Sequence, residues 1–187
     1  MGRLQVIDIK GNSTLVGMWY FSLLASKRAD MVFYEAPHDL ESVLLWTQRC
    51  SHIYGVFNEK MEIIGAGWSI CANPPRTEIG FGFNSLATGK NAVEGARLMI
   101  DRIFSEVFYP PWIPATAATG RPVNYLFGLT PEINKPALKL ASRVGLNLSE
   151  PIPDLCTTWS LDGENRRSAG VYTYISREEW TKLRQTK

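Results

Sequence analysis

The sequence has few of the residues that build metal centres and disulfide frameworks. Its 187 residues include two histidines, His38 and His52, and three widely spaced cysteines, Cys50, Cys71 and Cys156, with no C-x-x-C pair. These spacings offer no zinc ligand set. Isolated cysteines in odd number favour buried free thiols in a reducing compartment. We therefore expect no metal site.

The chain also lacks a strong charge of either sign and a long apolar run. Its formal net charge is +2, and its lysines and arginines are scattered, which gives non-specific nucleic-acid binding little electrostatic basis. The longest apolar run, LVGMWYFSLLA, is about half the length that a bilayer crossing needs. No N-terminal stretch has the pattern of a secretory signal. These absences predict a cytoplasmic protein that binds neither nucleic acid nor membrane.

The composition favours one compact domain over residues 1–187. Hydrophobic residues make up 45% of the chain, enough for a sizeable core, and no internal repeat or linker divides it. One stretch, FYPPWIPATAATGRP, cannot be regular structure and predicts a proline-rich loop insert at about residues 108–122. Trp112 in this insert is a candidate to cover an acceptor pocket or to anchor a partner.

Hydrophobic periodicity and turn residues predict the order strand, helix, helix, three strands, helix, strand, helix, two strands. The predicted strands are 3–9, 52–57, 62–71, 77–83, 123–130, 156–163 and 169–176, and the predicted helices are 14–26, 39–50, 91–107 and a short one ended by Gly145, before a C-terminal tail. The stretch Asn12-Ser13-Thr14 is the expected cap of the first helix, and Asp39 is that of the second. An antiparallel meander followed by βαβ units gives an α/β fold, with a mixed, mostly antiparallel central sheet flanked by helices.

The stretch TGKNAVEGARLMIDRIF, residues 88–104, opens from a turn straight into an amphipathic helix. Such a turn presents backbone N–H groups to a phosphate, and the helix dipole adds to the attraction. The alternative is an ordinary strand-to-helix turn that contains a glycine. The residues alone leave both interpretations open.

Four segments in the same order resemble the GCN5-related N-acetyltransferase superfamily, and more narrowly its ribosomal-protein acetyltransferase subgroup. They are TEIGFGFN, GKNAVEGARLMIDRIF, LTPEINKPALKLASRVGL and VYTYISREEW. The first resembles the family's fourth strand, the second its pyrophosphate loop and helix, the third its strand-to-helix motif, and the last its closing strand and tail.

The resemblance implies acetyl-coenzyme A as co-substrate. The pyrophosphate would face backbone N–H groups at a helix start, and the pantetheine amides would pair with the edge of a splayed strand. The residues that the family pattern assigns to the coenzyme are Phe81, Gly82, Phe83, Thr88, Gly89, Lys90, Asn91, Ala92, Asn134 and Ala137.

The loop departs from the family pattern at two positions. Asn91 stands where a second glycine or alanine is usual, and Leu86 stands where a glutamine or arginine is usual. Asparagine tolerates unusual backbone angles, so the loop geometry is not excluded. Both departures weaken the case for coenzyme binding more than the case for the fold.

The resemblance also places catalytic groups. Glu78 matches the family's base on the fourth strand, with a strand-edge carboxylate exposed to water or paired with Arg76 as the alternative. The position of the family's acid, usually a tyrosine, is occupied by Ala141, which cannot donate a proton. Ser142 is the substitute candidate, and its alternative is a helix-surface serine. Tyr172 and Tyr174 are further candidates, or else core or edge aromatics.

Two functions follow from these observations. The first is an N-acetyltransferase that moves an acetyl group from acetyl-coenzyme A to a primary amine of a small molecule or a peptide N-terminus. The alternative is a catalytically silent relative that serves as a binding or structural subunit, for example in a bacteriophage virion or assembly, as a homo-oligomer or in a larger protein assembly. An open gap between the fourth and fifth strands favours the enzyme, and a gap plugged by side chains or by the proline-rich loop favours the subunit.

Overall fold

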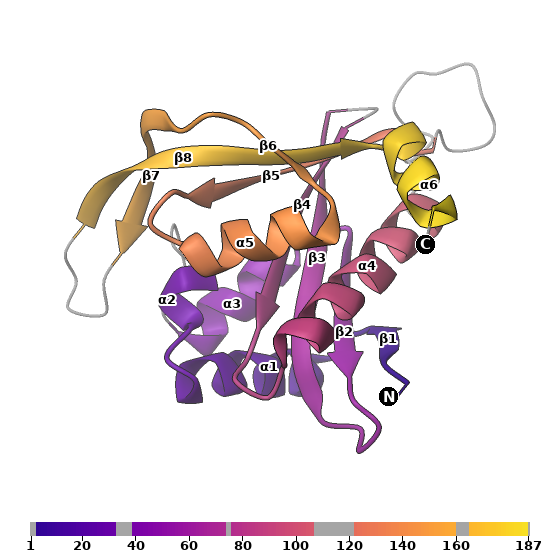
Figure 1. The fold of residues 1–187 in the computed structure, drawn as a ribbon. Coiled ribbons are helices and arrows are strands. Elements are labelled where there is room, and N and C mark those ends of the chain that lie inside the picture. Colours follow the sequence, from indigo (N-terminus) through magenta and orange to yellow (C-terminus); the bar gives the residue numbers. More distant parts are fainter. Residues whose placement is uncertain (1–2, 33–38, 74–75, 107–121, 160–164, 187) are drawn as a thin grey trace.

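The computed structural model describes residues 3–32, 39–73, 76–106, 122–159 and 165–186 (Figure 1). Trp112 and nearly all of the predicted proline-rich insert lie outside these residues. The helices are α1 (Ser13–Ala25), α2 (Ala29–Val32), α3 (Leu40–Thr47), α4 (Gly89–Glu106), α5 (Lys135–Val144) and α6 (Arg177–Gln185). The strands are β1 (Gln5–Asp8), β2 (His52–Phe57), β3 (Ile63–Asn73), β4 (Arg76–Phe83), β5 (Tyr125–Pro131), β6 (Asn147–Leu148), β7 (Ile152–Trp159) and β8 (Asn165–Ser176).

The predicted α/β fold is confirmed: the described strands form one 8-stranded, mostly antiparallel sheet in the order β1-β2-β3-β4-β5-β8-β6, and β7 pairs with β8. Strands β1 to β4 form the antiparallel meander, β5 joins β4 in parallel, and β8 runs antiparallel to β5. Asn12 and Asp39 cap α1 and α3 as predicted, because their side-chain oxygens accept the N–H groups of Leu15 and Ser42.

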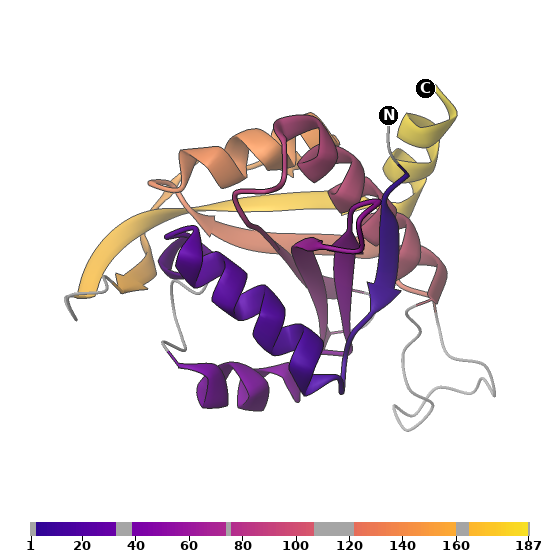
Figure 2. The same cartoon turned by 90° about the horizontal axis from the view of Figure 1, so that it is seen from below.

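Helices cover both faces of the sheet, with α1 and α3 on one side and α4 and α5 on the other (Figure 2). Each side has its own buried cluster: Met99, Ile100 and Ile103 of α4 belong to one, and Trp19 and Leu23 of α1 belong to the other. None of the helices in the described ranges is long and apolar enough to cross a membrane.

Trp19 fastens α1 to the central strands. Its side chain is fully buried, its ring centroid lies 6.0 Å from that of Trp68, and its Nε1 donates to the carbonyl oxygen of Gly82 at 3.1 Å. A β-carbon on Gly82 would come within 3.0 Å of the Trp19 ring, so the glycine is what lets the ring reach the strand.

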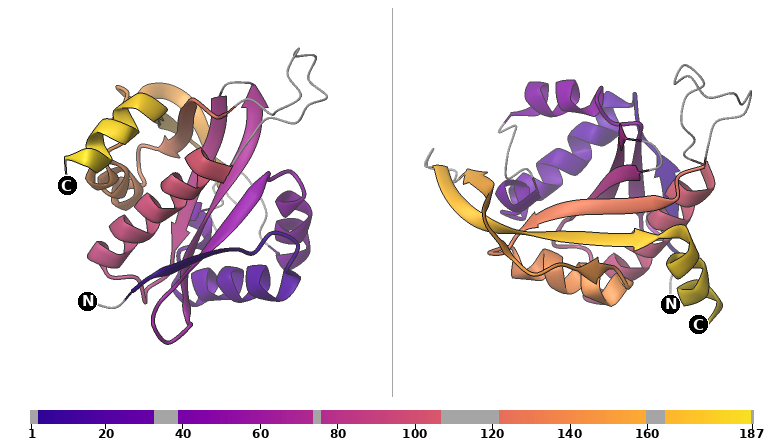
Figure 3. Two further views of the ribbon diagram at one scale, coloured as in Figure 1. Left: turned by 90° about the vertical axis from the view of Figure 1, so that its right-hand side faces the viewer. Right: turned by 90° about the horizontal axis from the view of Figure 1, so that it is seen from above.

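The C-terminal segment, predicted as a tail with at most a last helical turn, forms the nine-residue helix α6 instead. The reason is a capping box: the Ser176 hydroxyl accepts the N–H of Glu179, and the Glu179 carboxylate accepts the N–H of Ser176. Trp180 then donates its ring N–H to Asp101 of α4 at 2.8 Å, and α6 lies close to α4 in both views of Figure 3.

Arg177, the first residue of α6, joins two parts of the chain that are distant in sequence. Its guanidinium donates to the carbonyl oxygen of Val123 at 2.8 Å and to that of Phe104 at 2.5 Å, and it lies over the Phe104 ring. Its backbone N–H donates to the carbonyl oxygen of Asn124. One side chain therefore ties the end of α4 to the residues just before β5.

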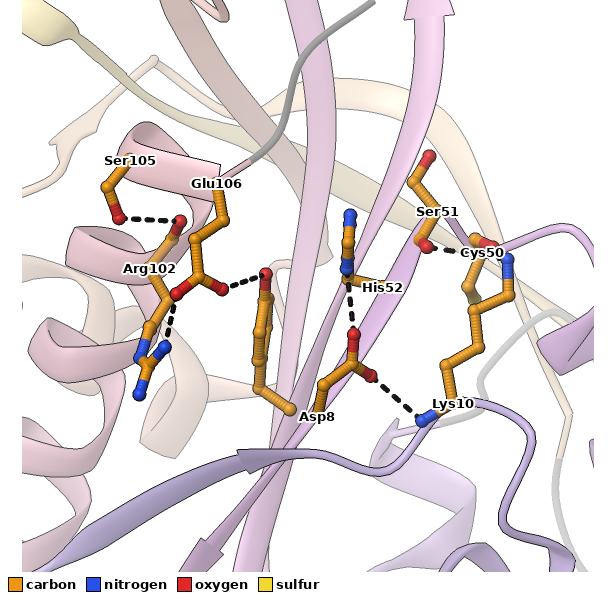
Figure 4. A network of polar contacts seen from close by, with 9 residues as sticks. Asp8, Lys10, Cys50, Ser51, His52, Arg102, Ser105 and Glu106 are labelled. Atoms are coloured by element: carbon orange, nitrogen blue, oxygen red, sulfur yellow. Dashed lines mark hydrogen bonds and ion pairs between the residues drawn. The ribbon is translucent and has the colours of Figure 1, made fainter. Parts of the chain in front are cut away.

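A polar network at the far end of α4 holds the first two strands to that helix (Figure 4). Asp8 of β1 contacts Nδ1 of His52 at 2.8 Å, and the His52 ring stacks on Tyr54, whose hydroxyl donates to Glu106. Burial, followed by the charge of Glu106, raises the pKa of Tyr54. The Tyr54 hydroxyl therefore stays protonated and serves as a hydrogen-bond donor.

Gly145 ends α5 in the left-handed conformation, with φ of 110°. Its N–H reaches the carbonyl oxygens of Ala141 and Ser142, and a β-carbon here would lie 2.3 Å from Leu183 of α6. We expect Gly145→Ala to lower the free energy of unfolding by about 1–2 kcal/mol, because alanine resists positive φ and displaces Leu183. Urea denaturation measures the loss. The exposed Ser142→Ala in the same helix is the control, and equal stability of the two variants would contradict this account.

Candidate coenzyme groove

The site begins where β4 and β5 part. The two strands pair in parallel at Arg76, Thr77 and Glu78 of β4, and no further pairing follows among the described residues. The rest of β4, from Gly80 to Phe83, diverges from β5, and Figure 1 shows β5 running across the direction of β2 to β4. This splay leaves one edge of β4 without a strand partner along these residues.

A small cavity of about 70 Å³ lies in the splay, with Gly80 on one side, Leu129 on the other and Ala141 of α5 against it. Beside it runs a larger groove of about 550 Å³, a size typical of small-molecule sites. The two share Phe81, Asn134 and other lining residues. Within the described ranges, side chains leave this cavity in the gap between the fourth and fifth strands, and nearly all of the proline-rich insert lies outside those ranges.

The groove contains most of the residues that the family pattern assigns to the coenzyme. The predicted residues that line it are Phe81, Gly82, Phe83, Gly89, Ala92, Asn134 and Ala137. Asn134 is held at the groove because it caps α5: its side-chain oxygen accepts the N–H of Ala137 at 3.2 Å. Thr88, Lys90 and Asn91 are not among the residues that line this groove.

The backbone N–H groups expected to face the pyrophosphate, those of Gly89, Lys90, Asn91 and Ala92, fall into two pairs in the first turn of α4. Thr88 satisfies two of them, because its hydroxyl accepts the N–H of Asn91 at 3.2 Å and its carbonyl oxygen accepts that of Ala92 at 2.8 Å. The N–H groups of Gly89 and Lys90 have no acceptor within the described part of the chain. At a helix start they carry the positive end of the dipole, so they suit an anion.

The walls of the groove are cationic. Lys27 and Arg28 line one side, Lys139 and Arg143 line the other, and none of its lining residues within the described ranges is acidic. Arg28 is fixed by donating to the carbonyl oxygens of Phe83 and Asn84 at 3.0 and 2.9 Å. Four positive charges around one groove favour an anionic ligand even though the whole chain is nearly neutral.

Glu78 lies on the opposite face of β4 from the α4 core. Ile79 and Phe83 pack with α4, whereas Gly80 faces Trp68 and Gly82 faces Trp19, so alternation along the strand turns Glu78 toward the α1 and α3 side. It is half-buried, opposite Ile70 on one neighbour and Phe127 on the other. Its role as base stays a prediction.

The charge of Glu78 also affects Cys50, a buried thiol of the α1 and α3 cluster. Burial raises the pKa of the Cys50 thiol to about 12, and the negative charge of Glu78 adds to that increase while Lys10 and Arg49 oppose it. Since Cys50 packs in the α1 and α3 cluster, this effect agrees with the strand alternation that turns Glu78 toward that side of the sheet.

The acid candidates are also distributed over the two faces. Ala141 is buried beside the splay. Ser142 is exposed and lines neither the small cavity nor the groove, so it has the surface position that was the alternative to a role as acid. Tyr172 and Tyr174 are half-buried and turn to the face of Glu78, because Thr173 between them points to Gly128 and the α5 side. Tyr172 pairs with Leu129, which lines the splay, so of the two tyrosines it is the one level with the gap.

Sequence reasoning missed the basic residues of the groove. Lys139 and Arg143 are four positions apart in α5, and Lys27 and Arg28 follow α1, so no local motif joins them. An i, i+4 pair of cations on a helix also fits a solvated surface. The groove is formed by three segments that meet only after folding.

Comparison with known proteins identifies the fold. No model of a known protein family matches the sequence, and no curated protein matches it. Solved structures do match over nearly the whole chain. An aminoglycoside acetyltransferase in complex with coenzyme A and kanamycin has 15% identity, covers 97% of this chain and 99% of its own, and has a TM-score of 0.66.

Two further acetyltransferases are similar to the same extent. A spermidine N-acetyltransferase from Vibrio cholerae, in complex with coenzyme A and spermine, has 14% identity, coverage of 95% and 98%, and a TM-score of 0.66. A ribosomal-protein-S5-alanine acetyltransferase from Vibrio fischeri has 14% identity, coverage of 96% and 98%, and a TM-score of 0.65. This chain therefore has the fold of the GCN5-related N-acetyltransferases, and no subgroup stands out among the three.

Proposed function

We propose that the protein is an N-acetyltransferase that uses acetyl-coenzyme A to acetylate a primary amine. The observation that carries the proposal is the open, cationic groove that leads from the two unpaired N–H groups of α4 to the splay between β4 and β5. A pyrophosphate suits the two unpaired N–H groups, and an extended, amide-bearing arm suits the splay. The coenzyme A complexes of two similar structures support the same use of the fold.

In this proposal the coenzyme and the amine reach the splay from opposite faces of the sheet. The coenzyme would enter from the α4 and α5 side, and its thioester would reach the gap beside Gly80 and Leu129. The amine would approach from the face that carries Glu78 and Tyr172. Its nitrogen attacks the thioester carbonyl carbon, the carbon–sulfur bond breaks, Glu78 takes the amine proton, and the thiolate leaves with a proton from an acid. Tyr172 is the best-placed candidate for that acid.

The acceptor belongs to the class of primary amines. Kanamycin and spermine, present in two of the similar structures, both carry such groups, and a third similar protein is named for an alanine of a ribosomal protein. These three amines therefore make the first panel to test: kanamycin, spermine and a peptide with an N-terminal alanine.

Calorimetric titration with acetyl-coenzyme A tests the proposal. We expect saturable binding at micromolar to submillimolar concentration, and release of free thiol when an accepted amine from the panel is added. Absence of binding at millimolar acetyl-coenzyme A would end the proposal. Binding without turnover for any amine would instead favour the silent binding subunit.

A further inference from the structure

We infer that Arg143 of α5 is the pyrophosphate anchor of the groove, in place of the glutamine or arginine that the loop before α4 lacks. The inference rests on the proposed use of coenzyme A and adds a binding residue to it. Position 86, where the resembled family has glutamine or arginine, holds a leucine that is 56% exposed and offers a phosphate no hydrogen bond. A side chain from elsewhere in the fold can therefore supply that contact.

Arg143 is placed beside the first turn of α4. A β-carbon built on Gly89 would lie 3.7 Å from Nη1 of Arg143, so the guanidinium is next to the two N–H groups that lack an acceptor. Arg143 lines the main groove and also an adjoining recess of about 380 Å³, formed with Gly89, Lys90, Val93, Glu94 and Arg97. It lies between two spaces open to a ligand.

Arg97 holds this end of α5 in position. Its guanidinium donates to the carbonyl oxygens of Arg143 at 2.9 Å and Val144 at 3.3 Å, which fixes the last turn of α5 against α4. The Arg143 side chain has no ion pair with a carboxylate in the described ranges, and the neighbouring Glu94 forms none with it. The guanidinium is therefore available to bind an anion. Its planar set of N–H donors suits a phosphate better than the ammonium group of a lysine does.

Three ligands distinguish the phosphates. Coenzyme A carries the pyrophosphate and a 3′-phosphate, 3′-dephospho-coenzyme A keeps only the pyrophosphate, and pantetheine has neither. We expect Arg143→Gln to weaken the first two by about tenfold each, the loss of one partly exposed charge-assisted hydrogen bond, and to leave pantetheine unchanged. Arg143→Lys keeps the charge but not the fork, so a smaller loss is expected.

Lys135→Gln is the matched control, because it removes one positive charge from the same helix at a residue that lines neither space. It is expected to change each affinity less than twofold. Unchanged coenzyme A affinity in Arg143→Gln would overturn the inference, and so would a loss confined to coenzyme A, which would assign Arg143 to the 3′-phosphate. If the unmodified protein binds none of the three ligands, the proposed function fails first and the inference falls with it.

Discussion

Replacing Glu78 by glutamine is expected to lower kcat/KM for an accepted amine by about a hundredfold or more while leaving the affinity for acetyl-coenzyme A unchanged. The carboxylate lies on the face of β4 opposite the α4 core, outside the lining of the groove, so the change does not touch the coenzyme. Glutamine keeps the size of the side chain but loses its negative charge and its capacity to take a proton. Thiol release measures the rate, and calorimetry measures the affinity.

A dependence on pH separates this role from a structural one. The deficit of Glu78→Gln should shrink as the pH rises toward the pKa of the acceptor amine, because the free amine then needs no base. Glu150→Gln, at an exposed carboxylate remote in sequence from β4, is the control and should retain full activity. A pH-independent deficit, or one accompanied by weaker coenzyme binding, would refute the assignment of Glu78 as base.

Trp19→Ala is expected to reduce the free energy of unfolding by about 3–5 kcal/mol, the range for removing a fully buried large aromatic side chain. The variant loses the packing on Trp68 and the hydrogen bond from the ring N–H to the carbonyl oxygen of Gly82. Chemical denaturation followed by circular dichroism gives the difference. The exposed Phe21→Ala in the same helix should change stability by less than about 0.5 kcal/mol.

The Trp19 variant also bears on the groove. Gly82 lines the groove, and the strand that carries it is held from behind by the Trp19 ring. We expect the folded fraction of Trp19→Ala to bind acetyl-coenzyme A more weakly than the unmodified protein. A loss of stability below about 1 kcal/mol would contradict the view that this ring anchors α1 to β4.

Much of the fold could be predicted from local patterns. The bounds of β2 were predicted to the residue, and α1, α3, β3, β4 and α4 lie within three residues of the predicted ranges, because their periodicity and caps are local. Helix α2 and strand β6 were missed because each is too short to show a period. The early start of β7 was missed because Pro153 and the positive φ of Asp154 accompany an irregular pairing with β8.

The candidate site could be predicted only in part, for a physical reason. Gly82, Gly89 and Asn134 were found because each stands in a segment with a resemblance of its own. Lys27 stands in no such segment, and the resemblance assigns no role to Lys139 and Arg143 of the third segment. Their meeting depends on how α1 and α5 pack around β4. The capping box of α6 was visible in the sequence as Ser176 and Glu179, and the prediction of a tail left it unused.

The bonds of Arg177 to Phe104 and Val123 have a consequence for how the chain tolerates changes of length. These contacts join the two ends of the segment 107–121 through one guanidinium, so the rest of the fold does not depend on that segment to keep α4 and β5 together. The entropy of closing a loop grows only slowly, by about 0.6 kcal/mol for each doubling of its length. Insertions and deletions between Glu106 and Pro122 are therefore expected to cost little stability, and natural variants of this protein are expected to differ in length there.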